Sequence, residues 1–111
     1  MNTLKNRVQL IGNLGNDPEV IQTESGKKLA KFSLATNENY KNARGERTTE
    51  TQWHQIVAWN KTAEIIEKFA TQGKKIAVTG KLTNRSYEDS KGQKRYITEV
   101  VAQEILLLKN N

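Results

Sequence analysis

The sequence predicts an all-β protein, a five-stranded barrel with one α-helix between its third and fourth main strands. The chain has 111 residues, enough for one domain around a single core. Along most of it, apolar and polar residues alternate, as they do in strands that bury one face. Only one segment spaces its apolar residues as a helix does, and it follows the third main strand.

The alternation defines five main strands and one short one. The main strands are expected at about residues 4–14, 28–40, 50–59, 74–87 and 94–102. The short strand covers residues 19–23, before the second main strand. Glycine-containing turns at 24–27 and 88–93 join neighbouring strands into hairpins. Residues 41–49 hold no apolar residue except Ala43, so a mobile loop is expected there.

The single helix is expected over residues 61–72. Its apolar stripe consists of Ala63, Ile65, Ile66, Phe69 and Ala70. Asn60 is a suitable N-cap residue, and Gly73 is a suitable residue to end the helix. Of the aromatic side chains, we assign Phe32 and Phe69 to the core.

This order of strands and helix is that of the OB-fold, a Greek-key barrel of five strands. Closing the sheet into a barrel also removes the exposed edges that so many short strands would otherwise present. We expect residues 1–108 to form this one domain and residues 109–111 to be a short C-terminal end.

The composition favours binding to an anionic partner. Eighteen Lys and Arg against twelve Asp and Glu give a net charge of +6, which attracts polyanions such as nucleic acid, anionic lipid or an acidic protein. No apolar run approaches the ~18 residues of a membrane span, so no membrane partner is expected. Without cysteine the chain has no disulfide or thiolate metal site, and it suits a reducing cytoplasm.

Catalysis is not expected. The chain has a single histidine, His54, and lacks phosphate-binding loops, zinc-binding helices and nucleophile motifs. The acidic pairs Glu64/Glu67 and Glu88/Asp89 have no further ligand at a useful spacing, so no metal and no cofactor is expected. His54 itself is expected to be structural or to lie at an interface.

Aromatic residues interleaved with cations give the strongest functional signal. Trp53 and Trp59 share one face of the third main strand, while His54 and Ile56 lie on the other. Such tryptophans can be core residues, but polar side chains share their face and Lys and Arg follow nearby. Rings beside cations suit single-stranded nucleic acid, whose bases stack and whose phosphates attract cations. The pattern favours a stacking surface, and the role of Tyr96 stays open.

Five segments carry a resemblance to a known family. They are residues 12–20 (GNLGNDPEV), 34–38 (LATNE), 51–54 (TQWH), 81–87 (KLTNRSY) and 98–101 (TEVV). Through them the chain resembles the bacterial single-stranded DNA-binding protein (SSB) family, colinearly from about Asn6 to about Val101. The resemblance implies an OB-fold that assembles as a homotetramer, built from dimers. It also implies wrapping of single-stranded DNA in replication, recombination and repair.

The resemblance assigns roles to individual residues. The stacking aromatics fall on Tyr40, Trp53, Trp59 and Tyr87. The implied phosphate contacts are Arg7, Lys61 and Arg85, to which we add the nearby cations Lys41, Arg44, Arg47 and Lys81. The expected subunit contact comprises Leu4, Arg7, Gln9 and His54, with the first strand pairing with its copy in a neighbouring subunit.

Two other functions remain open, an OB-fold RNA-binding protein or chaperone and an adaptor in a replication-restart complex. A metal-dependent nuclease is a more distant alternative. Members of the family typically continue into a flexible segment with an acidic tail that recruits partner proteins. This sequence stops at Asn111 without such a tail, so recruitment by that route is not expected. The expected location is the cytoplasm, at the nucleoid or the replication fork.

Overall fold

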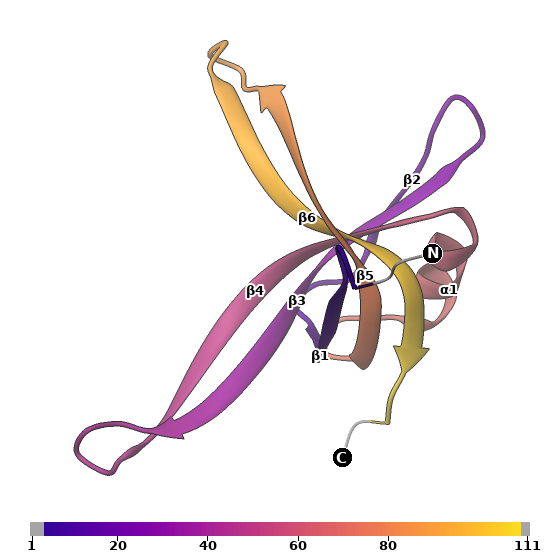
Figure 1. The fold of residues 1–111 in the computed structure, drawn as a ribbon. Helices are drawn as coiled ribbons and strands as arrows, with labels where there is room; N and C mark the ends of the chain where they lie inside the picture. The colour runs from indigo at the N-terminus through magenta and orange to yellow at the C-terminus, as the bar shows by residue number, and fades with distance from the viewer. Residues whose placement is uncertain (1–3, 110–111) are drawn as a thin grey trace.

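The chain folds into six strands and one helix (Figure 1). The computed structural model describes residues 4–109. Residues 1–3 of the predicted domain and residues 110–111 of the predicted C-terminal end therefore lie outside the described residues. In chain order the elements are β1 (Val8–Leu14), β2 (Glu19–Gln22), β3 (Lys28–Lys41), β4 (Arg47–Trp59), α1 (Asn60–Phe69), β5 (Lys75–Glu88) and β6 (Lys94–Leu107). The short strand is β2, and α1 lies between the third and fourth main strands, as predicted.

The strands form one sheet that closes on itself in the order β1-β5-β6-β4-β3-β1, with β2 added beside β3. The barrel closes where β1 and β3 pair antiparallel, at Asn13↔Ala35 and Leu14↔Leu34. Gly12 permits this approach, because a Cβ at its position would lie 2.1 Å from the carbonyl oxygen of Ala35. A closed barrel of five main strands with one helix is the OB-fold, so that prediction is confirmed.

The core fills the barrel and extends beneath α1. Alternate residues of each strand face it, as in β3, where Ala30, Phe32 and Leu34 are buried. Ala63 and Ile66 of α1 join the same cluster. Full burial of a large apolar side chain contributes ~1.5–3 kcal/mol, so this cluster stabilises the barrel. The outward-facing positions of the same strands are thereby available for binding.

The exposed face of α1 contradicts the core assignment of Phe69 and holds one further residue of the predicted apolar stripe, Ile65. Phe69 is 56% exposed, and Ile65 is exposed as well. At 100° per residue, both lie about a quarter-turn or more from the stripe of Ala63 and Ile66 that faces the barrel. The helix is therefore apolar over a wider arc than the barrel covers.

The ends of α1 also differ from the prediction. Asn60 begins the helix instead of capping it; Trp59 holds the cap position in an extended conformation without a side-chain hydrogen bond. The φ of Asn60 is 54°, outside the extended region that a cap residue adopts. At the other end, the Ala70 N–H donates to the Ile66 carbonyl at 2.9 Å. Gly73 lies beyond, in the next turn, with a φ of 87°.

Two long hairpins, β3–β4 (residues 28–59) and β5–β6 (residues 75–107), extend beyond the barrel as separate arms (Figure 1). The predicted loop over 41–49 is too long: the two strands stay in register out to Lys41↔Arg47, and only residues 42–46 form the turn between them. Side chains near this end are exposed on both faces, so no hydrophobic alternation marks the strands.

Candidate nucleic-acid interface

The outer face of β4 carries both tryptophans, as the alternation predicts. Trp53 is 60% exposed and Trp59 is 41% exposed, while Ile56 and Ala58 between them point into the core. His54 lies on the inward side and is half-buried. The two indoles are therefore surface rings, and the reading of them as core residues is excluded.

The turn after β1 positions Trp53. A Cβ on Gly15 would lie 2.4 Å from Cζ3 of the Trp53 ring, so the indole rests against bare glycine backbone. The Gly15 N–H donates to the Ser33 carbonyl at 2.9 Å. The Asn16 Oδ1 accepts from the Ser33 N–H and hydroxyl at 3.0 and 2.8 Å. The sequence marks Gly15 only as part of a turn, and nothing in it indicates which distant ring the glycine accommodates.

Trp59 lines two depressions in the outer surface. One, of about 480 Å³, is lined by Thr23, Ser25, Lys27, Trp59 and Asn60. The other, of about 350 Å³, is lined by Leu29, Lys31, Val57, Trp59, Arg85, Glu99 and Val101. Each depression places an indole beside at least one cation, a combination suited to single-stranded nucleic acid.

Arg85, a predicted phosphate contact, forms an ion pair within the chain. Its Nε donates to Oε1 of Glu99 at 2.7 Å, and its Nη2 makes a longer 3.4 Å contact with Oε2. Glu99 is only 7% exposed, whereas the Arg85 side chain is about half-exposed. The hydrogen bond that Arg85 donates to Glu99, followed by the charge of the Glu99 carboxylate, raises the pKa of Arg85. The role of Glu99 as the buried partner of Arg85 was not predicted, because a single carboxylate in a strand is ordinarily expected to face solvent.

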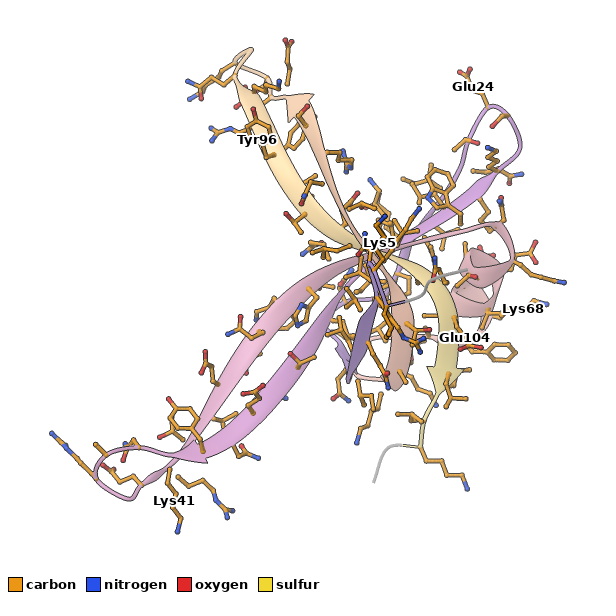
Figure 2. The ribbon with its side chains drawn as sticks, in the orientation of Figure 1. Lys5, Glu24, Lys41, Lys68, Tyr96 and Glu104 are labelled. Carbon is orange, nitrogen blue, oxygen red and sulfur yellow. The ribbon has the colours of Figure 1, made fainter. Side chains whose placement is uncertain are left out.

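The predicted cations of the β3–β4 hairpin lie at its outer end (Figure 2). Lys41 and Arg47 face each other across the hairpin, on the same face as Trp53, and Arg44 lies in the turn between them. Tyr40 is about half-exposed, and the unbroken register places it on the opposite face. The implied stacking rings therefore do not share one face of this hairpin.

The outward faces of β4 and β5 carry five of the predicted site residues. They are Trp53, Trp59, Lys81, Arg85 and Tyr87, spread over β4 and β5, with β6 between these strands. Arg7 is exposed just before β1. Lys61 lies in the first turn of α1, beside a depression that also contains Lys28 and Glu64.

The predicted subunit-contact residues surround an open strand edge. β1 bonds to β5 along most of its length but meets β3 only at its last two residues. Leu4, Arg7 and Gln9 are exposed on or before β1. His54 Nε2 lies 3.0 Å from the Thr36 hydroxyl, close to where β1 and β3 meet.

Residues 4–109 hold neither a membrane-spanning helix nor a cluster of metal ligands. No helix in this range is long and apolar enough to cross a membrane. The same residues contain no group of three or more His, Cys, Asp or Glu placed to hold a metal ion.

The sequence matches known proteins along most of its length. Residues 5–108 match the profile of the Single-strand binding protein family. The chain is 43% identical over 104 residues to single-stranded DNA-binding protein 1 of Chlorobaculum tepidum, covering 93% of this chain and 64% of that protein. It is 41% identical to the single-stranded DNA-binding protein of Rickettsia typhi, covering 95% of this chain and 73% of the relative.

A solved structure shares the fold. The Plasmodium falciparum SSB, in its complex with ssDNA, superposes with a TM-score of 0.85 at 31% identity, over 94% of this chain and 95% of that one. The OB-fold, the matched residues and the identities lead to one assignment: the chain belongs to the single-strand binding protein family.

Proposed function

We propose that this protein binds single-stranded DNA without sequence preference and protects and organises it in replication, recombination and repair. The observation that carries the proposal is the exposure of Trp53 and Trp59 on a face that also presents Lys31, Lys81 and Arg85. The names of the relatives and the ssDNA in the Plasmodium falciparum complex support the same ligand.

The proposed mechanism has two parts. Lysine and arginine side chains neutralise phosphates and release counterions, so log affinity falls with log salt by ~0.7 per contacted phosphate. Trp53, Trp59, Tyr87 and Tyr40 stack bases of any identity, at ~1–3 kcal/mol for each base. Neither part needs a catalytic group, a metal or a cofactor, so the proposed activity is binding alone.

We further propose that the active form is a homotetramer built from dimers. The open edge of β1 is suited to antiparallel pairing with the same strand of a second copy, as the family resemblance implies. Leu4, Arg7 and Gln9 would lie at this contact, with His54 close by. This assembly would act in the cytoplasm, at the nucleoid or the replication fork, where unpaired DNA is present.

The test is a titration of single-alanine variants with poly(dT). Trp53→Ala and Trp59→Ala should each weaken binding by ~1–3 kcal/mol without unfolding the protein, because both rings are exposed. Phe69→Ala is the matched control: its ring is also exposed, but on α1, and its removal should leave affinity unchanged. In the unaltered protein, tryptophan fluorescence should fall as poly(dT) is added.

Two results would contradict the proposal. A Trp53 or Trp59 variant that unfolds while each folded molecule keeps full affinity would show that the ring is structural. Competition between DNA and RNA strands of equal length addresses the main alternative. A preference for RNA would indicate 2′-hydroxyl contacts and favour an RNA-binding protein.

A further inference from the structure

Tyr96 is the most exposed aromatic side chain of residues 4–109. It lies toward the outer end of the β5–β6 hairpin (Figure 2) and is 75% exposed, more than either tryptophan. An isolated tyrosine on a protein surface needs no explanation by itself. Its surroundings, however, resemble those of the rings on the outer face of the barrel.

The register places Tyr96 and Tyr87 on opposite faces of the hairpin. Tyr87 lies across from Arg95, and Ser86 lies across from Tyr96. Residues that pair across antiparallel strands share a face, and neighbours along a strand alternate between faces. Tyr96 therefore lies outside the surface formed by Tyr87 and Arg85.

The β3–β4 hairpin shows the same arrangement. Tyr40 lies on one face and Trp53 on the other. Both long hairpins thus present exposed rings on both faces: Tyr40 opposite Trp53 and Trp59 in one, and Tyr96 opposite Tyr87 in the other. If Tyr40 takes part in stacking, the bound strand passes round the edge of one hairpin, and the second hairpin offers an equivalent ring in Tyr96.

The face around Tyr96 is polar and carries charges of both signs, because Glu88 lies across from Lys94. The Lys94 ammonium lies over the Tyr96 ring, 5.6 Å from its centroid. Further in, the Thr98 hydroxyl donates to the Asn84 amide oxygen at 2.7 Å. A protein partner usually covers such a ring with apolar neighbours, whereas the residues next to Tyr96 on this face are polar, and the exposed Leu82 lies further in, beyond the pair of Asn84 and Thr98. A ring with a cation beside it suits a nucleobase and its phosphate.

We propose that Tyr96 and Lys94 form an additional contact for single-stranded DNA, on the far face of the β5–β6 hairpin. A base stacks on the side of the Tyr96 ring away from Lys94, and the Lys94 ammonium neutralises a neighbouring phosphate. This inference rests on the proposed DNA-binding function and extends the path of the strand beyond the outer face of the barrel.

The experiment titrates dye-labelled (dT) strands of increasing length with the full chain and its variants. Tyr96→Ala should bind long strands at least about fivefold more weakly, which corresponds to ~1 kcal/mol of lost stacking. Affinity for the shortest strands that bind should be unaffected, because these strands contact only the outer face of the barrel and do not reach Tyr96. Tyr96→Phe keeps a ring and should stay within about twofold of the unaltered protein. Lys94→Gln should reduce the salt slope on long strands by ~0.7.

The outcomes separate this inference from the proposed function. Equal affinity of Tyr96→Ala and the unaltered protein at every length, with Trp53→Ala weakened, overturns the inference and leaves the function standing. A lower mass of Tyr96→Ala in solution with unchanged affinity would make the ring a protein contact, which also overturns the inference. Failure of the unaltered protein to bind any (dT) strand would instead refute the proposed function.

Discussion

Replacing Gly15 with alanine tests whether the turn after β1 positions the Trp53 ring. The added Cβ would lie 2.4 Å from Cζ3 and 3.0 Å from Cη2 of the indole. Ordinary contact begins at 3.4 Å, so the ring must withdraw by 3.4 − 2.4 = 1.0 Å. The φ of Gly15 is not in the left-handed region, so the backbone accepts alanine without strain.

The expected cost falls on binding more than on folding. The closest atoms belong to the exposed Trp53 side chain, which can turn away from the methyl group, while the Ser33 hydroxyl, 3.1 Å from the added Cβ, must shift by only a few tenths of an ångström. A displaced indole loses part of the ~1–3 kcal/mol of one stacked base, so we expect a loss of about 1 kcal/mol in DNA binding. The free energy of unfolding should change by less than that, because the core side of the turn is untouched.

A double-mutant cycle measures this coupling. Affinity for (dT) is determined for Gly15→Ala, Trp53→Ala and the double variant, together with urea unfolding of each. If Gly15 acts through the ring, alanine at position 15 costs nothing once Trp53 is gone. Additive losses in the cycle, or a collapse of stability in Gly15→Ala alone, would refute the reasoning.

Two further predictions concern ion pairs of the β5–β6 hairpin. Arg85→Ala should lower the free energy of unfolding by about 1–2 kcal/mol, because Glu99 stays buried without its partner, and solvent at the half-exposed guanidinium limits the loss. Urea unfolding at fixed protein concentration measures the free energy of unfolding. Adding Glu99→Gln to the Arg85→Ala variant should restore part of the lost stability. An unchanged free energy of unfolding in Arg85→Ala would contradict the prediction. The Arg95 guanidinium, aided by the backbone N–H groups of Gln93 and Lys91, holds the pKa of Asp89 below its ordinary 3.8. An ionised Asp89 stabilises the fold at any pH above its pKa in the unfolded chain, and this contribution is lost as pH falls through its lower pKa in the folded protein. The turn should therefore loosen only below pH 3.8. An NMR titration midpoint for Asp89 at or above 3.8 would contradict this prediction.

The barrel could be predicted from the sequence because its strands bury one face. Alternation placed Phe32 in the core and the two tryptophans of β4 outside it, and the structure agrees on both. The helix could be located because it also buries one face, but the sequence did not predict how much of its surface the barrel covers. Whether Phe69 is covered depends on how far the barrel reaches around α1, which no local pattern encodes.

Contacts between distant residues could not be predicted in the same way. Gly15 meets Trp53 only because the barrel closes, and Arg85 meets Glu99 only because β5 and β6 pair in one particular register. The family resemblance named Trp53 and Arg85 as site residues, but not the residues that hold them. Those supporting residues appear only once the strands are in place.

The end of the β3–β4 hairpin was missed, unlike the turn of the β5–β6 hairpin, for a different physical reason, which bears on binding. Ordering a residue's backbone costs about 1–2 kcal/mol, and beyond the barrel no core burial offsets this cost. Backbone pairing and cross-strand bonds, such as that from the Thr51 hydroxyl to Asn37 at 2.6 Å, must hold these ends together. Such segments lie at the low end of local stability. A strand stacked on Tyr40 or Tyr96 would therefore order the hairpin it touches, because the contact adds stabilisation where the fold itself provides little.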